Sequence, residues 1–495
     1  MGLLARQASY NFLLTYAGLL LGFLNIAVLY PSVLPTDQFG LTRLLVSLAT
    51  MAGAFAQLGL DNTIVRYFPY FRDVSRRHNG LLTLIVAVAL AGGFLAMLVL
   101  GVFHPFFTGI FGDKNGLYAA FGLYALPLVL AEVFFLVLRG YSRSLHRTVP
   151  PTFLREFLLR LLQTILIGAQ ALWHFPFATF MLLFTCTFLI CTLWLVADLW
   201  RQGERLTPWR SVRAPQRLRR SMIRYSAYTL AASVASVVLG SLDQLMIGAL
   251  LGREALAQVG YYAVAFNFGA VVSAPMRALG QLAIPMVADA WKRRDRPAIQ
   301  RMYERTVSTQ FTIGGFLFLV VWINLTDLFS YLRPEFGVAR TTAIIISASS
   351  LLNMAVGMNA GIITMSRNFR FDSASSLLLL LCNALLNWFF IQRLGIQGAA
   401  WSTAVSLTLV LSVRVWYLWS RFNLWPYTWR TLMVPLLIGS IGVAVIQMPT
   451  TGAAWVDIGL RSLIVALAYW PLAAVLKVAP ELTERPVRAI FGKQA

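Results

Sequence analysis

Apolar runs of about 20 residues recur along the whole chain, separated by short polar segments. A helical run of that length crosses the hydrocarbon core of a bilayer, whereas barrel strands would show shorter stretches of alternating polarity. The pattern therefore predicts an all-α polytopic membrane protein with about 14 transmembrane helices. The expected spans are 10–34, 40–62, 80–103, 116–138, 153–173, 177–199, 222–251, 259–288, 306–332, 341–365, 373–392, 398–419, 431–448 and 456–478.

Composition supports a membrane protein. The 495 residues are 58% hydrophobic and only 12% charged, against about 25% charged in soluble domains. The net charge of +22 would suggest a nucleic-acid partner in a soluble protein. Here the Lys and Arg residues lie in short loops, where they face membrane lipids instead. Cys186, Cys191 and Cys382 lie within apolar runs, with no metal or disulfide spacing, so no cofactor is predicted.

The positive charges also predict an orientation. With the N-terminus inside, about 30 Lys and Arg residues fall in cytoplasmic segments and about six in outer segments. Lys and Arg concentrate on the cytoplasmic side of membrane proteins. We therefore expect a multi-pass protein with both termini cytoplasmic.

Two halves of the chain look alike. The second predicted helix begins Gln38-Phe39-Gly40 and the eighth has Gln258-Val259-Gly260, and an Arg-rich loop follows each. The pattern predicts an N-lobe (1–205), a cytoplasmic linker (206–221), a C-lobe (222–420), two further helices (421–480) and a tail (481–495). Six-helix repeats would be parallel, with a substrate path at their interface; coincidence among apolar helices is the alternative.

Charged side chains interrupt the fifth predicted helix. Glu156, Arg160 and Gln163 share one face, and Arg155 is adjacent. Ionisable groups within a membrane helix usually face a bundle interior or a water-filled cavity. One interpretation is therefore a cavity wall that attracts an anion. The other is a Glu156–Arg160 ion pair that joins helices.

A second polar stripe lies on the eighth predicted helix, where Asn267, Arg277 and Gln281 share a face. Arg277 falls near the middle of its span, so it must face water or pair with another helix. A guanidinium suits bidentate binding of phosphate. A structural pair with Asp243 on the seventh helix is the alternative.

Oxygen-bearing side chains form a third group, which comprises Asp243, Asn383, Asn387 and Thr403 on the seventh, eleventh and twelfth helices. Carboxylate, amide and hydroxyl oxygens are ligands that small hard cations prefer. Sodium or proton coupling is one interpretation. Hydrogen bonding between membrane helices is an equally good one.

Several function classes lack their motifs. The chain has no G-x-x-x-x-G-K-[ST] loop for nucleotide phosphates. It has no soluble catalytic domain and no large outer loop of the kind a membrane glycan polymerase or ligase would use. A transporter driven by an ion gradient or by substrate flux is favoured, and we do not expect an enzyme.

Particular segments resemble the polysaccharide-biosynthesis (O-antigen/oligosaccharide) flippases of the multidrug/oligosaccharidyl-lipid/polysaccharide exporter superfamily, which are related to lipid II flippases. Each segment is a loose motif, and their order and placement at helix ends carry the resemblance. They are Leu34–Leu41, Leu58–Pro69, Ser241–Gly248, Gly260–Ala263 and Leu394–Ala400.

The resemblance implies two six-helix lobes around a basic central cavity that opens alternately to each side. It implies an undecaprenyl-diphosphate-linked oligosaccharide as substrate, in cell-envelope pathways such as lipopolysaccharide synthesis, with glycan polymerases and glycosyltransferases as partners. Arg277 and Arg43 match cavity cations of relatives by helix, and Arg160 by inference.

Sodium-coupled relatives extend the resemblance to the oxygen-bearing group. They use an Asp on helix seven, an amide/acid pair on helix eleven and a Thr on helix twelve. Asp243, Asn383, Asn387 and Thr403 look similar, although Asn387 stands where an acid is expected. The loss of that negative charge weakens the expected affinity for sodium.

An ion-coupled drug or cation antiporter of the same superfamily is the nearest rival function. Such a protein would need acids in its N-lobe cavity, and Glu132 and Glu156 are the candidates. A net-basic cavity disfavours organic cations.

Overall fold

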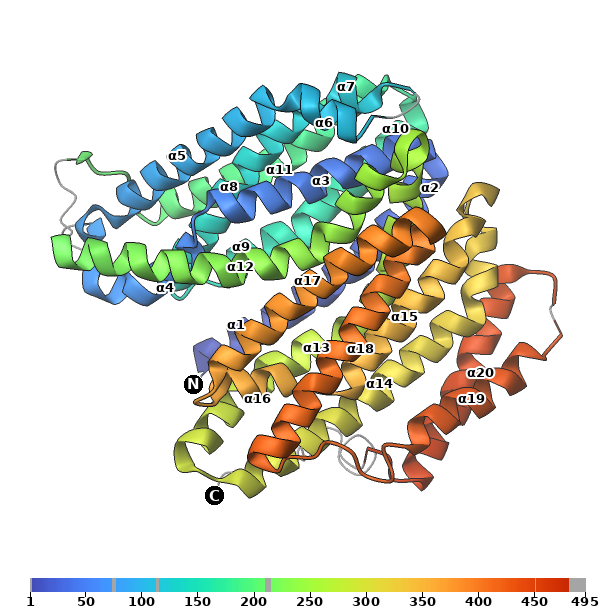
Figure 1. Ribbon diagram of the computed structural model, residues 1–495. Coiled ribbons are helices and arrows are strands. Elements are labelled where there is room, and N and C mark those ends of the chain that lie inside the picture. Colours follow the sequence, from blue (N-terminus) through green and yellow to red (C-terminus); the bar gives the residue numbers. More distant parts are fainter. Residues whose placement is uncertain (1, 74–76, 113–114, 210–214, 450, 480–495) are drawn as a thin grey trace. The chain divides into compact units, whose positions relative to one another are not determined.

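The structure is a computed structural model that describes residues 2–73, 77–112, 115–209, 215–449 and 451–479 (Figure 1). Within its helices, the side chains of 2–9, 228, 231–233, 236, 277–278, 281–282, 285 and 369 lie outside the description. The chain forms helices joined by short connections, and it divides into two compact units, Met1–Ala263 and Val264–Ala495.

Unit 1 begins with a helix that contains a π-helical turn. Its elements are α1 (Gly2–Phe23), η1 (Leu24–Leu29), α2 (Tyr30–Val33), α3 (Thr36–Ala56), α4 (Leu60–Phe71), η2 (Arg77–Gly80), α5 (Leu81–Val102), α6 (His104–Ile110), α7 (Leu117–Phe121), η3 (Gly122–Tyr124), α8 (Ala125–Ser144), α9 (Val149–Thr152), η4 (Phe153–Leu158), α10 (Leu159–Trp173), α11 (Phe177–Arg201), α12 (Gln216–Leu250) and η6 (Gly252–Glu254). Helix α13 (Ala255–Arg293) starts in unit 1 and continues into unit 2.

Unit 2 consists mainly of long helices. Its further elements are α14 (Arg296–Ser330), η7 (Pro334–Val338), α15 (Ala339–Ala355), α16 (Asn359–Met365), α17 (Phe369–Leu394), α18 (Ile396–Phe422), α19 (Met433–Ile446) and α20 (Ala454–Val475). Helix α14 packs against α15, α19 and α20, while α18 packs against α15 and α17.

Within the described residues, 11 helices are long and apolar enough to cross a membrane. The all-α, multi-pass architecture is confirmed, but the count of fourteen is not. Two predicted spans fall short for local reasons. The segment 153–173 carries charges within an interrupted helix, and 431–448 contains only the 14 residues of α19. The predicted span 222–251 lies within α12 apart from its last residue, and several of its side chains are outside the described residues.

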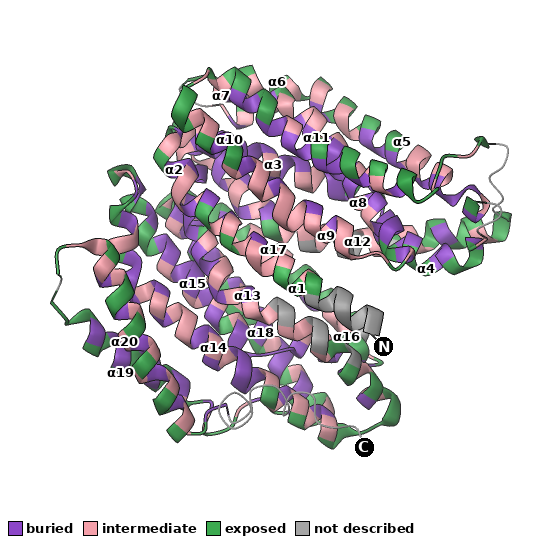
Figure 2. Cartoon of the chain, turned by 180° about the vertical axis from the view of Figure 1, so that it is seen from behind, coloured by how far each residue is buried: buried purple, intermediate pink, exposed green. Residues whose placement is uncertain are grey.

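Helix α8 organises the packing of unit 1, since it contacts α3, α4, α5 and α11. Buried residues concentrate on these contact faces, whereas exposed apolar residues cover the outward faces of helices such as α5 (Figure 2). Phe94 and Leu95 of α5 are both at least 60% exposed. Apolar outer faces of this kind are what lipid solvates in a membrane protein.

Two glycines allow the start of α3 to lie directly against the start of α13. A Cβ at Gly40 would overlap the backbone carbonyl of Leu256, and one at Gly260 would lie 2.8 Å from the carbonyl oxygen of Thr36. Small residues permit such close approach between membrane helices. The two glycines end the matching segments Gln38-Phe39-Gly40 and Gln258-Val259-Gly260, and both lie in unit 1.

Candidate functional site

The π-helical segment η4 places Arg155 beside a buried carboxylate. Its guanidinium lies 2.7 Å from an oxygen of Glu132 on α8, and 5.5 Å from the ring centroids of Phe135 and Phe188. Single π-helical turns inside α-helices frequently occur at functional sites because they redirect side chains. The Arg155 side chain stays 26% exposed, whereas that of Glu132 is 6% exposed.

Arg160 forms the ion pair that the sequence offered as one of two interpretations. A guanidinium nitrogen lies 3.0 Å from Glu156, and the Arg160 side chain remains 31% exposed. The side chain also packs against Gly18 and Gly22 of α1, where a Cβ would lie within 3.4 Å of it. Both arginines of this segment are thus paired and still partly accessible, so pairing and a cavity role are compatible.

The same region contains the hydrogen-bonded side-chain amide of Asn25, in the segment η1 that continues α1. Asn25, in η1, donates to the carbonyl oxygen of Arg160 at 2.9 Å and accepts from Thr164 at 2.7 Å. Asn25 therefore ties the π-helical segment η1 to α10. Gln163 of α10 is buried as well, at 7% exposure.

Arg43 occupies a different environment, among aromatic rings of α2, α3 and α11. Its guanidinium lies 4.9 Å from the ring centroid of Tyr30 and 5.8 Å from those of Phe39 and Phe184. Cation–π attraction grows when the partners are removed from water. Among the described residues, no carboxylate forms an ion pair with Arg43.

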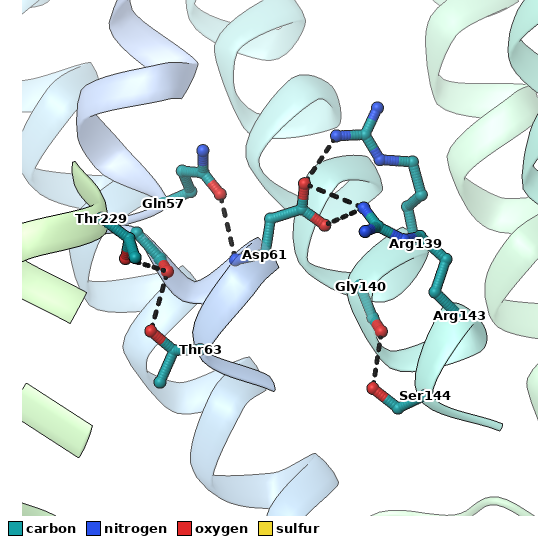
Figure 3. Close-up of polar contacts among 9 residues, drawn as sticks. Gln57, Asp61, Thr63, Arg139, Gly140, Arg143, Ser144 and Thr229 are labelled. Atoms are coloured by element: carbon teal, nitrogen blue, oxygen red, sulfur yellow. Dashed lines mark hydrogen bonds and ion pairs between the residues drawn. The ribbon is translucent and has the colours of Figure 1, made fainter. Parts of the chain in front are cut away.

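Sequence reasoning missed an ion cluster around the buried Asp61, which Figure 3 shows. One carboxylate oxygen lies 2.8 Å from Arg139 and the other lies 3.3 Å from Arg143, one turn further along α8. Both arginines belong to the cytoplasmic Lys and Arg residues that predict the orientation. Their spacing of four residues was the available signal that both could reach one partner.

A break in the second transmembrane helix positions Asp61. Helix α3 ends at Ala56, Leu58 and Gly59 take positive φ angles of 53° and 74°, and α4 restarts at Leu60. Gln57 accepts a hydrogen bond from the Asp61 amide at 3.3 Å. Because α4 runs on to Phe71, the predicted end of this span at residue 62 was early.

Hydroxyl groups join α4 to α12 alongside this break. Thr63 and Ser226 lie 2.7 Å apart. Thr229 donates to the carbonyl oxygen of Gly59 at 3.3 Å, and Figure 3 shows Thr229 beside Thr63. Tyr67 and Ser221 lie 2.7 Å apart one turn further on. The start of α12 is therefore held against α4 by side-chain hydrogen bonds.

The predicted cation ligands divide between the units. In unit 1, Asp243 accepts a hydrogen bond from Tyr262 at 2.5 Å. In unit 2, Asn383 donates to Thr403 at 3.1 Å and accepts from Asn387 at 3.1 Å. The structure brings these last three together as a buried hydrogen-bonded chain between α17 and α18.

The remaining predicted residues lie on α13. Asn267 is half-buried in unit 2. The side chains of Arg277 and Gln281 lie outside the described residues. The proposed pair of Arg277 with Asp243 and the cavity role of this stripe both stay predictions.

Comparison with known proteins gives a consistent picture. The sequence model of a family described as polysaccharide biosynthesis protein matches residues 4–291. An uncharacterised membrane protein of Methanocaldococcus jannaschii is 22% identical over 420 residues, which cover 79% of this chain and 80% of that protein.

Two solved structures have a similar fold. The lipid II flippase MurJ, in an inward closed conformation, matches 93% of this chain and 98% of its own, with a TM-score of 0.69 at 11% identity. An inward-facing multidrug resistance MATE family transporter of the MOP superfamily matches 86% and 94%, with a TM-score of 0.61 at 13% identity.

Proposed function

Because this chain belongs to the polysaccharide biosynthesis protein family, we propose that it is a flippase for an undecaprenyl-diphosphate-linked oligosaccharide. The cargo would move from the cytoplasmic to the periplasmic leaflet of a bacterial inner membrane. Its prenyl tail would stay in the lipid while its diphosphate and glycan pass through the protein. The fold, which is shared with flippases and multidrug transporters, supports a transport role.

The observation that carries this proposal is the pair of guanidinium groups on the charged segment of η4 and α10. Arg155 and Arg160 lie among apolar helices, yet 26% and 31% of their side chains remain exposed. Ionisable groups placed there are costly and usually serve a substrate path. Each guanidinium has five N–H donors, so pairing with one carboxylate leaves donors for a diphosphate.

The cargo chemistry implies neighbours in the cell. A glycosyltransferase must build the lipid-linked glycan on the cytoplasmic side, and a glycan polymerase or transferase must consume it outside. Cytoplasmic termini fit this direction, because the Arg-rich loops would then face the anionic inner leaflet.

The test is the location of lipid-linked oligosaccharide in cells depleted of the protein. Spheroplasts would be probed from outside with a membrane-impermeant sugar-binding or sugar-cleaving reagent. We expect the intermediate to accumulate while remaining shielded from the reagent, and complementation to restore its access. An accumulated but accessible intermediate would move the defect to a later step and contradict the flippase.

A drug or cation antiporter is the second candidate, because the MATE transporter has a similar fold. The paired acids Glu132 and Glu156 are its only N-lobe cavity candidates from the sequence, and each is neutralised by an arginine. If no lipid-linked intermediate accumulates in depleted cells, while sensitivity to cationic drugs rises, this second function replaces the first.

Ion coupling gives a separate prediction at Asp243. If its carboxylate binds a cation during transport, Asp243→Asn should lower sodium stimulation of transport at least about fivefold, since it removes the charge and keeps the shape. Transport in inverted vesicles with and without a sodium gradient measures this. Tyr262→Phe is the matched control, because it removes the same hydrogen bond and leaves the carboxylate. Equal responses in both variants would leave Asp243 a packing role.

A further inference from the structure

A basic pocket lies in unit 2, away from the residues considered so far. Three segments enclose a volume of about 450 Å³: the first turns of α14, the loop between α18 and α19, and the residues that follow α20. Arg301, Arg305, Arg430 and Lys477 line it, and among the described residues Glu304 is the only carboxylate that does so. The sequence pattern had assigned these cations to membrane orientation alone.

Specific hydrogen bonds hold the α18–α19 loop against α14. The Gln300 side chain donates to the carbonyl oxygen of Trp425 at 2.6 Å and accepts from its amide at 3.0 Å. Gln300 also donates to Glu304 at 2.6 Å, which satisfies part of the hydrogen-bonding capacity of that carboxylate. These hydrogen bonds hold in place the loop that carries Trp429 and Arg430, so this side of the pocket is formed before a ligand binds.

Another hydrogen bond holds the segment after α20 against α14. The Ser308 hydroxyl on α14 donates to the carbonyl oxygen of Val478 at 2.6 Å. The preceding residue, Lys477, has a φ of 50°, in the left-handed region that glycine adopts more easily. A lysine in that conformation is a local cost of the kind that functional sites retain. Lys477 thus places a cation at the pocket, at a helix end where glycine would adopt the same backbone conformation at a lower cost in free energy.

Apolar surface adjoins the charged pocket. Leu432 and Leu436, at the start of α19, are 61% and 63% exposed, and Val475 at the end of α20 is 77% exposed. Trp429, which lines the pocket, is 63% exposed. Tryptophan of this kind is enriched at the level of lipid headgroups. A site with anion-binding donors beside an apolar surface suits an amphiphile better than a soluble anion.

We propose that this pocket binds the phosphate headgroup of an anionic membrane glycerophospholipid, whose acyl chains lie along α19 and α20. Basic pockets between transmembrane helices on the cytoplasmic side recognise such headgroups. Arg301 and Arg430 supply forked donors for phosphate oxygens, and Lys477 adds a mobile point charge. The proposal concerns a bound membrane lipid and not the transported cargo, so it stands or falls independently of the flippase function.

The experiment uses the full-length protein in phosphatidylcholine vesicles with a rising fraction of phosphatidylglycerol that carries brominated acyl chains. Bromine quenches nearby tryptophan, and the difference between the wild type and Trp429→Phe isolates Trp429 among the 14 tryptophans. We expect half-maximal Trp429 quenching at a lower fraction of brominated phosphatidylglycerol than of brominated phosphatidylcholine. In R301Q/R430Q/K477Q, the required fraction should rise at least about tenfold.

A matched control removes three other cations from exposed positions of the same unit. R367Q/R370Q/R421Q makes the same change in net charge at arginines that do not line the pocket, and it should behave as the wild type. Equal weakening in both triple variants, or equal quenching by the two lipids, would overturn the site. Gel filtration first verifies that each variant is folded.

Inorganic diphosphate separates a lipid from a soluble anion. In vesicles without phosphatidylglycerol, diphosphate should change the thermal unfolding of neither the wild type nor the pocket variant R301Q/R430Q/K477Q. If diphosphate stabilises the wild type alone, while the pocket variant still binds brominated phosphatidylglycerol normally, the pocket belongs to a soluble anion and the lipid assignment is wrong.

Discussion

Arg155→Gln should lower transport at least about tenfold, even if the protein folds, because its guanidinium is proposed to contact the cargo diphosphate. The substitution also leaves the buried Glu132 without its cation, at 6% side-chain exposure. Stranding a buried charge in this way destabilises a protein by a few kcal/mol. A simple loss of transport in the single variant is therefore ambiguous between chemistry and folding.

The double variant Glu132→Gln/Arg155→Gln resolves that ambiguity. Two neutral amides can hydrogen-bond to each other, so we expect the folded yield to return towards that of the wild type. If Arg155 contacts the cargo, transport should stay at least about tenfold low. Accessibility of the lipid-linked intermediate in spheroplasts provides the transport measurement, and gel filtration of the solubilised protein provides the folded yield.

A second pair in the same segment serves as the comparison. Glu156→Gln/Arg160→Gln removes another ion pair of η4 and α10, whose two side chains are 34% and 31% exposed. Exposed pairs contribute little to stability, so the folded yield should hardly change. If the Glu132/Arg155 double variant transports at the wild-type level, the ion pair is structural and Arg155 has no part in the cargo path.

Hydropathy predicted the all-α architecture well, because a segment that crosses lipid must satisfy its backbone hydrogen bonds within a helix, and that helix is a long apolar run. Hydropathy did not settle the number of spans, because some helices carry charged side chains. The segment 153–173 is interrupted by η4 and carries three charges that pair within unit 1. Those side chains lower the hydropathy of the helix, so the features that make it a candidate site also hide it from a length-and-composition criterion.

Helical spacing predicted the pairings within one helix and missed those between helices. Glu156 with Arg160 and Asn383 with Asn387 are four residues apart, so both contacts followed from the sequence. Asp61 and Arg139 are 78 residues apart, and their contact depends on how α4 crosses α8. No periodicity within either helix specifies that crossing, so the ion cluster of Figure 3 emerged only from the tertiary structure.

The glycine contact between α3 and α13 yields the second large expected effect. Gly40→Ala should destabilise the protein by about 3 kcal/mol or more, because its methyl group would overlap the Leu256 carbonyl and the backbone would have to move. Gly260→Ala should cost less, since its nearest contacts are the Thr36 carbonyl oxygen at 2.8 Å and a Phe39 ring carbon at 3.2 Å. Thermal aggregation midpoints in one detergent compare the variants, because unfolding of membrane proteins is rarely reversible.

Gly240 supplies the control for that series. It lies within α12, and a Cβ there would meet nothing within 4 Å. Alanine is the better helix former by about 1 kcal/mol, so Gly240→Ala should be neutral or stabilising. The expected order of stability is therefore Gly240→Ala, then Gly260→Ala, then Gly40→Ala. If Gly40→Ala were as stable as Gly240→Ala, the start of α3 would not lie against α13.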